Sequence, residues 1–287
     1  MGQREYLFVL KTEIMPERSN QTMDDNYPLD ANQLAHYAQN QCIKLKNVLT
    51  EYEIRHYNKA ISAKVDALNV EKRPLNERDT YGKAFIQITN LWQRDDAIKS
   101  LVFSKRLASI AAALMQVDSV RLYHDQALFK EAGGGYTPWH ADQYYWPLAS
   151  DKSITAWIPL QKTSLEMGAL EFSAGSHELR DGRNLAISDD SEDAIQRALS
   201  SNRYRHIIEP FDVGEVSFHA GWTFHRASPN QTDQTRKVMC IIYLDGEMRL
   251  AKPINEHQQL DWDVWCPGVQ VGEIIDSPLN PVLFKRP

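Results

Sequence analysis

Residues 133–142 have the sequence Gly-Gly-Gly-Tyr-Thr-Pro-Trp-His-Ala-Asp, in which His140 and Asp142 lie two positions apart. On an extended strand this spacing puts both side chains on one face, where both can reach one metal ion. His225 can add a second imidazole if a distant strand lies opposite the first. Two imidazoles and one carboxylate can occupy one face of an Fe(II) ion and leave the opposite face open. The sequence therefore predicts a metal site formed by His140, Asp142 and His225.

Arg236 follows His225 by eleven positions, at the start of a predicted strand. A planar guanidinium can bind a carboxylate through two parallel hydrogen bonds, so Arg236 is a candidate for the far carboxylate of a diacid cosubstrate. The set of four side chains points to an oxygen-activating enzyme that consumes 2-oxoglutarate. His219, six positions before His225, is an alternative third ligand. We favour His225 because of its spacing to Arg236.

The composition is that of an ordinary globular protein, with 287 residues of which 43% are hydrophobic and 24% are charged. The net charge of -6 argues against nucleic-acid binding as the main task. No apolar run reaches the roughly 18 residues that a membrane span requires. Cys42, Cys240 and Cys266 are far apart, which favours free thiols over disulfides or a zinc site. We therefore expect a cytoplasmic protein with a small-molecule substrate and no nucleic-acid or membrane partner; the oligomeric state stays open.

The first part of the chain, about residues 30–116, has helical signals that follow a polar loop or arm at 11–29. A short helix is predicted at 30–40, capped by its first residue. A capping box at 50–53 precedes apolar residues at three- and four-residue steps, which indicates a second helix. A third helix is predicted at about 104–115.

After residue 118 the hydrophobic pattern changes. Apolar and polar residues now alternate in short segments, which are separated by glycine-bearing turns. The predicted strands are Val120–Phe129, Ile154–Leu160, Ala169–Phe172, Glu215–Phe218 and Lys237–Leu244. Alternation in the first strand places on one face Val120, Leu122, His124, Gln126 and Leu128. Helices followed by strands predict a mainly β fold, with a sandwich or jelly roll at about 118–248 and the helices packed on one sheet. We expect a single domain over residues 1–287.

An acidic segment, Asp189–Asp193, interrupts the strands and leads into a predicted short helix at Ala194–Leu199. Acidic residues suit the first turn of a helix. The insertion at about residues 178–207 is either a solvated surface excursion or a lid, because long insertions between strands often cover active sites.

Five motifs between Phe85 and Asp245 add to this interpretation. They are His124-Asp125-Gln126-Ala127-Leu128-Phe129-Lys130, residues 133–142, Thr155-Ala156-Trp157-Ile158-Pro159-Leu160, Gly168-Ala169-Leu170 with Gly175-Ser176-His177, and the block from His225 to Arg236. In these motifs the chain resembles the phytanoyl-CoA dioxygenase family of Fe(II)/2-oxoglutarate oxygenases.

The resemblance implies a double-stranded β-helix, which is a jelly roll, with Fe(II) as the metal and with 2-oxoglutarate and O2 as cosubstrates. It implies that the catalytic iron ligands are His140, Asp142 and His225. It also implies that Arg236 pairs with the C5 carboxylate of 2-oxoglutarate. The other cosubstrate contacts that it implies are Trp157, Gln126, Thr137 and, from the strand before the third predicted helix, Gln87. Some members have a serine where this chain has Ala227, so that hydrogen bond is absent or comes from Ser228.

Aromatic side chains follow the first ligand pair. A period of two assigns Tyr144 and Trp146 to the face of His140 and Asp142, so we expect both to border the substrate, with Tyr145 facing away. Phenolic groups there favour a small polar or amphipathic substrate.

The expected reaction is hydroxylation of an unactivated C–H bond, with release of succinate and CO2. A demethylation, desaturation or cyclisation outcome is an alternative within the same class. A jelly-roll protein that binds metal or ligand without turnover is an alternative from another class, and a cupin-type metalloenzyme without a cosubstrate is a third.

Overall fold

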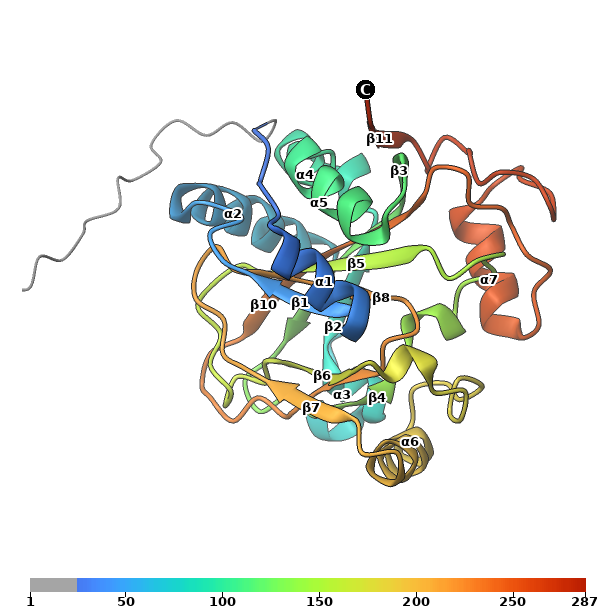
Figure 1. Cartoon of the computed structure of the whole chain (residues 1–287). Helices are drawn as coiled ribbons and strands as arrows, with labels where there is room; N and C mark the ends of the chain where they lie inside the picture. The colour runs from blue at the N-terminus through green and yellow to red at the C-terminus, as the bar shows by residue number, and fades with distance from the viewer. Residues whose placement is uncertain (1–24) are drawn as a thin grey trace, which may run out of the picture.

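The computed structural model describes residues 25–287, so the first part of the predicted arm, 11–24, lies outside the described residues. Two antiparallel sheets face each other and form the predicted jelly roll (Figure 1). The larger sheet has the order β1 (Cys42–Leu45), β8 (Val216–Ala220), β5 (Ser153–Pro159), β10 (Arg236–Asp245), β3 (Ser119–Lys130) and β11 (Val282–Lys285), and β2 (Ile86–Thr89) also pairs with β3. The smaller sheet has the order β4 (Thr137–His140), β9 (His225–Ala227), β6 (Leu170–Ala174) and β7 (Arg205–Ile208).

Helices cover the outer face of the larger sheet, as the sequence predicts (Figure 1). They are α1 (Ala31–Asn40), α2 (Glu51–Leu68), α4 (Asp96–Val102) and α5 (Lys105–Met115). Asp30 and Thr50 each complete a capping box at the start of α1 and α2, which satisfies backbone N–H groups that the helix itself leaves free. The apolar faces of these helices and the outer face of the sheet form one buried core.

The remaining α-helices do not contribute to this core. They are α3 (Thr80–Ala84), α6 (Asp189–Ser201) and α7 (Glu256–Trp265). The 3-10 turns are η1 (Leu75–Glu77), η2 (Leu91–Gln93), η3 (Asp142–Tyr144) and η4 (Ser176–Glu178). The segment predicted as helical also contains β1 and β2, and α6 begins before the predicted Ala194, at Asp189. The C-terminal elements α7 and β11 were not predicted.

A β-bulge in β3 changes which face of the larger sheet its side chains meet. The register to β10 shifts between Leu122 and His124. Val120 and Leu122 therefore pack in the core under the helices, whereas His124 and Gln126 line a cavity between the sheets. The prediction of one continuous face was wrong, because a bulge adds one residue and reverses the alternation beyond it.

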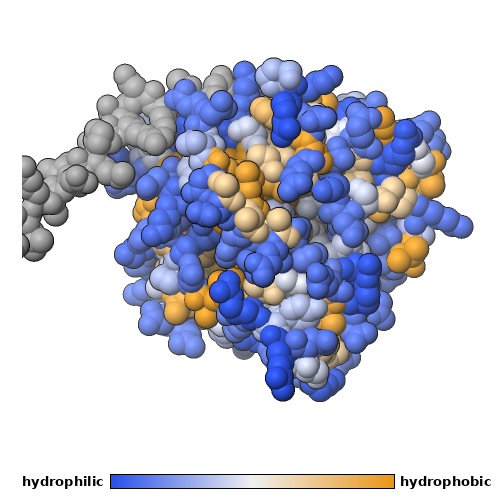
Figure 2. Space-filling view, viewed as in Figure 1, coloured by the Kyte–Doolittle hydropathy of each residue, from blue (hydrophilic) through white to orange (hydrophobic). Residues whose placement is uncertain are grey.

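The three cysteines are free, as predicted, and all three are buried. Among the described residues, no helix has both the length and the apolar character that crossing a membrane would require. The face in Figure 2 is largely hydrophilic, with apolar side chains in separate groups.

Candidate active site

The three predicted metal ligands lie together, although they come from elements far apart in the sequence. His140 ends β4 and pairs directly with His225 of β9. Asp142 is the first residue of η3, and its Oδ1 lies 3.6 Å from Nε2 of His140 and 3.5 Å from Nε2 of His225. One ligand atom from each residue lies within 4.8 Å of the other two. The arrangement can hold a single metal ion.

Backbone carbonyl groups orient both imidazoles. Nδ1 of His140 lies 2.8 Å from the carbonyl oxygen of Pro138, and Nδ1 of His225 lies 3.0 Å from that of Thr223. A carbonyl oxygen can only accept a hydrogen bond, so each Nδ1 carries the proton and each Nε2 keeps its lone pair. Both lone pairs are thus available to the same ion, as is usual for histidine ligands.

The carboxylate of Asp142 is held through its other oxygen. Oδ2 accepts a hydrogen bond from Oγ1 of Thr155 at 3.0 Å and lies 3.3 Å from Nε2 of His219. Burial raises the pKa of Asp142, but the neighbouring imidazoles, that of His225 first, outweigh it and hold the pKa well below its usual range. Burial and the nearby His140 hold the pKa of His225 well below its usual value. An ionised carboxylate and a neutral imidazole are the forms that bind a divalent cation.

His219, the alternative third ligand, lies behind the site. Its ring is 4.4 Å from that of His225, and its Nε2 faces the Asp142 oxygen that points away from His140 and His225. Within residues 25–287, the side chains close enough together to hold an ion are His140, Asp142 and His225. The geometry therefore favours His225 as the third ligand and gives His219 a role in holding Asp142.

Arg236 is a buried cation with an unused donor. Only 2% of the residue is exposed, and its Nη1 donates to the carbonyl oxygen of Gly168 at 2.6 Å. Its Nε is buried without a hydrogen-bond partner, and no carboxylate among the described residues forms an ion pair with it. Burial lowers the pKa of Arg236 to about 10, so it stays charged at neutral pH. A buried guanidinium in this state suits a carboxylate from a bound ligand.

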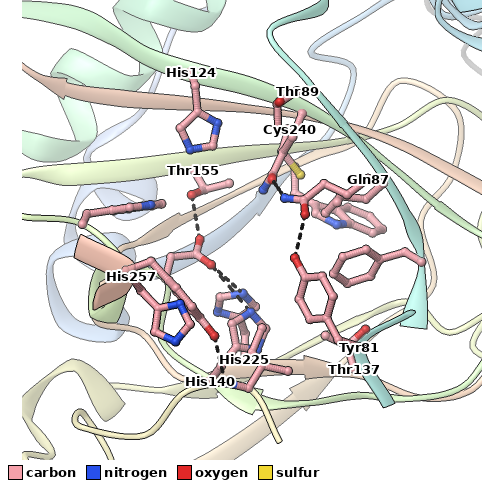
Figure 3. A pocket seen from close by; sticks show the side chains of 18 of the residues that line it. Tyr81, Gln87, Thr89, His124, Thr137, His140, Thr155, His225, Cys240 and His257 are labelled. Atoms are coloured by element: carbon pink, nitrogen blue, oxygen red, sulfur yellow. Dashed lines mark hydrogen bonds and ion pairs between the residues drawn. The ribbon is translucent and has the colours of Figure 1, made fainter. Parts of the chain in front are cut away.

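Both features open into one cavity of about 600 Å³ between the sheets (Figure 3). The predicted residues that line it are His140, Asp142, His225, Arg236, Trp157, Gln126, Thr137, Gln87 and Trp146. The ring of Trp157 packs 5.5 Å from the guanidinium of Arg236. Gln87 donates from its amide to Gln126 and accepts from the hydroxyl of Tyr81 at 2.6 Å. Figure 3 shows the contact between Gln87 and Tyr81.

The prediction for Tyr144 and Tyr145 was wrong. Tyr145 lines the cavity together with Trp146, whereas Tyr144 is absent from the residues that line it. The strand ends at His140 and the chain turns into η3 at Asp142, so a period of two no longer applies beyond the ligands.

Ser228 does not replace the serine that some family members have one position earlier. Its hydroxyl and its backbone N–H both bind the carboxylate of Glu171. Ala227 lines the cavity instead, so this wall offers an apolar methyl group.

One face of α7 closes a wall of the cavity that the sequence analysis missed. The side chains on this face are His257, Leu260, Asp261, Val264 and Trp265. The N-cap Asn255 and the spacing of three and four residues between these side chains are the signal that could have revealed a helix with one face toward the cavity. Tyr81 and Phe85, around α3, were also missed and lie in a segment too short for a periodic signal.

The insertion predicted as a possible lid is docked on the strand that carries His140. Glu192 of α6 accepts the backbone N–H of Trp139 at 2.7 Å, and Ser191 donates to the carbonyl oxygen of Trp139 at 3.1 Å. Ile187, just before α6, lines the cavity, and its N–H donates to the hydroxyl of Tyr145. A moving lid stays a prediction; the contacts make α6 a support for β4.

The family model of phytanoyl-CoA dioxygenase (PhyH) matches residues 38–238. The chain belongs to the phytanoyl-CoA dioxygenase family. It is similar to a protein of Stutzerimonas stutzeri described as a probable alpha-ketoglutarate-dependent hypophosphite dioxygenase, with 28% identity over 157 residues, 52% of this chain and 53% of that protein. It is also similar to a methylphosphonate hydroxylase of Gimesia maris, with 25% identity over 155 residues, 53% of this chain and 56% of that protein.

The matched region spans about half the length of these curated relatives. Among solved structures, the epimerase SnoN in complex with Fe3+, alpha ketoglutarate and nogalamycin RO is similar, with a TM-score of 0.72 and 22% identity over 88% of this chain and 98% of that one. This likeness shows a shared fold.

Proposed function

We propose that this protein is an Fe(II)- and 2-oxoglutarate-dependent dioxygenase that hydroxylates an unactivated C–H bond of a small molecule. The observation that supports the proposal is a single cavity in which His140, Asp142 and His225 converge beside the buried guanidinium of Arg236, whose Nε has no hydrogen-bond partner. Family membership and two relatives named as a dioxygenase and a hydroxylase point the same way. The buried free thiols suit a reducing cytoplasm, where we place the protein.

The metal would be held by Nε2 of His140, Oδ1 of Asp142 and Nε2 of His225, on one side of the ion. With 2-oxoglutarate and O2 bound, the iron would supply the oxidant, with release of succinate and CO2. Arg236 would seat the C5 carboxylate, and Trp157 would pack beside it. The apolar side chains of the cavity would exclude water and hold the substrate C–H bond toward the metal.

Gln87, Gln126 and Thr137 would border the cosubstrate. The hydrogen bonds that link Tyr81, Gln87 and Gln126 fix two amide groups at one wall, so their free polar atoms keep constant positions. Thr137 receives a hydrogen bond from Nζ of Lys130, which leaves its own hydroxyl hydrogen to donate.

The test is to titrate the protein anaerobically with Fe(II) and 2-oxoglutarate, follow the visible charge-transfer band, and then measure succinate after O2 is added. We expect the band to form in wild type and to be lost in Asp142→Ala. Asp193→Ala, at an exposed site on α6, should retain it. A charge-transfer complex that yields no succinate with any substrate, and none without substrate, would favour the binding protein. Demethylation, desaturation or cyclisation would show in the mass of the product.

A further inference from the structure

The wall of the cavity next to α7 combines aromatic rings with one carboxylate. We name it the aromatic wall; it consists of Tyr145, Trp146, Asp261 and Trp265. Trp265 of α7 stacks on His124, with ring centroids 5.0 Å apart. His124 pairs with Ile242, which lies six residues from Arg236 on β10. The part of the cavity next to α7 is therefore about 20 Å from Arg236 along the strand.

Asp261 has a neutral hydrogen-bond donor and no cationic partner. Its Oδ2 accepts a hydrogen bond from the hydroxyl of Tyr123 at 3.0 Å. Among residues 25–287, no lysine, arginine or histidine forms an ion pair with it. Burial raises the pKa of Asp261 to about 7, as expected for a carboxyl group without a counter-charge, so it is about half ionised at neutral pH. A cation bound beside it would favour the ionised form.

Tyr145 packs against the same helix. Its ring lies 5.2 Å from that of His257, one turn before Asp261 on α7. The hydroxyl of Tyr145 accepts the N–H of Ile187, which fixes the ring in the wall.

The balance of charge around the cavity separates its two ends. Besides histidines, the charged side chains that line it are Asp79, Asp142, Asp261 and Arg236. In the proposed function Asp142 binds the metal and Arg236 binds the diacid. Asp79 and Asp261 then remain, both acidic, with no lysine or arginine in the lining to offset them. Lysine and arginine other than Arg236 are absent there for an anionic substrate to pair with, whereas a cationic substrate would favour the ionised form of Asp261.

We propose that the aromatic wall binds the cationic end of a small organic substrate, an amine or quaternary ammonium group. The proposal rests on the proposed function, because it assigns the substrate class of the same site. Aromatic faces attract a cation through their quadrupole, and the desolvated carboxylate of Asp261 adds a direct counter-charge. The substrate would thus be of opposite charge to the hypophosphite and methylphosphonate named for the two curated relatives.

The experiment compares ligands that differ in charge and little in shape, on the anaerobic complex of the full chain with Fe(II) and 2-oxoglutarate. The probes are choline, ethanolamine, methylphosphonate, and 3,3-dimethylbutan-1-ol, which is the neutral carbon isostere of choline. Perturbation of the charge-transfer band reports binding near the metal. We expect choline to bind about tenfold or more tightly than its isostere, and methylphosphonate to have no effect at the same concentration. Equal affinities of choline and its isostere, or binding of methylphosphonate alone, would overturn the proposal.

A pair of variants on α7 assigns the effect to one carboxylate. Asp261→Asn should remove about tenfold or more of the affinity for choline and leave that for 3,3-dimethylbutan-1-ol unchanged. Asp263→Asn is the matched control, because Asp263 is exposed on the same helix and bonds only to Gln259. Asp263→Asn should bind choline as wild type does. Unaltered choline affinity in Asp261→Asn would contradict the proposal even if wild type prefers cations.

The two proposals fail in different ways. If the charge-transfer band does not form with Fe(II) and 2-oxoglutarate, the proposed function is wrong. If the band forms and choline binds no more tightly than the neutral alcohol, the cation site is wrong and the proposed function stands.

Discussion

Oγ1 of Thr155 donates a hydrogen bond to Oδ2 of Asp142 at 3.0 Å, across from the oxygen that faces the two imidazoles. This contact joins β5 of the larger sheet to η3, which follows the smaller sheet, so both layers contribute to the metal centre. It leaves Oδ1 as the oxygen free for the ion and favours coordination through one oxygen.

We predict that Thr155→Val weakens Fe(II) binding about 10- to 100-fold, because the carboxylate loses the group that fixes its rotation. Anaerobic competition with a coloured chelator measures the affinity. Thr163→Val is the control, since Thr163 is equally buried but its hydroxyl binds the carbonyl oxygen of Gln161. Wild-type affinity in Thr155→Val would show that His219 alone orients Asp142.

Arg236→Ala should raise the KM for 2-oxoglutarate about 10- to 100-fold, the value of a buried charge-assisted contact. Steady-state succinate formation at varied 2-oxoglutarate measures it. Arg249→Ala provides a comparison, because Arg249 also donates to a glycine carbonyl oxygen but is exposed. An unchanged KM in Arg236→Ala would mean that another group holds the diacid.

Lys130 predicts a dependence of stability on pH. Burial, and then the neighbouring Arg236, lower the pKa of Lys130 from 10.5 to about 6. Between these values the unfolded chain binds a proton that the folded protein lacks, so the stability contributed at this site rises with pH and is lost as pH falls toward 6. Urea unfolding at several pH values should show this rise in wild type and its loss in Lys130→Met.

The same residue predicts proton uptake when the cosubstrate binds. Lys130 is paired with Arg236 across β3 and β10, so an incoming carboxylate would raise the pKa of its amine. Calorimetry of 2-oxoglutarate binding at pH 7.5, in two buffers with different ionisation enthalpies, should reveal up to about one proton taken up. No difference between wild type and Lys130→Met would contradict a coupled Lys130.

Gly168→Ala should destabilise the fold by about 1–3 kcal/mol, because two costs combine there. The backbone has φ of +77°, and a Cβ would lie 2.3 Å from the carbonyl oxygen of Ser228. The carbonyl oxygen of Gly168 also accepts a hydrogen bond from Arg236. A shift of this carbonyl would displace the guanidinium, so the KM for 2-oxoglutarate should rise. Gly133→Ala isolates the backbone cost, since φ is +72° with open space around the Cβ. Equal changes in Tm for the two variants would contradict the steric argument.

The residues that carry the metal site could be found in the sequence because their chemistry depends on residue type and spacing. His140 and Asp142 converge as predicted, but on a strand end and a 3-10 turn rather than on one strand. The helices at Asp30 and Thr50 were predictable since a capping box is local.

What escaped prediction depends on tertiary context. The bulge beside His124 leaves no mark in the alternation of β3, and it decides which residues meet the cavity. Tyr145 replaces Tyr144 at the cavity because a turn, which no residue pattern announced, ends the strand early. Aspartate is usually exposed on a protein surface. Asp261 lines the cavity because α7 packs there, which no local pattern in the sequence indicates.

β4 is the outermost strand of the smaller sheet, and its free edge would expose hydrogen-bonding groups to other chains. Glu192 and Ser191 bind both backbone groups of Trp139 on that edge. The helix α6 therefore protects the strand from edge-to-edge association. Shortening the insertion would be expected to cause aggregation before any loss of chemistry.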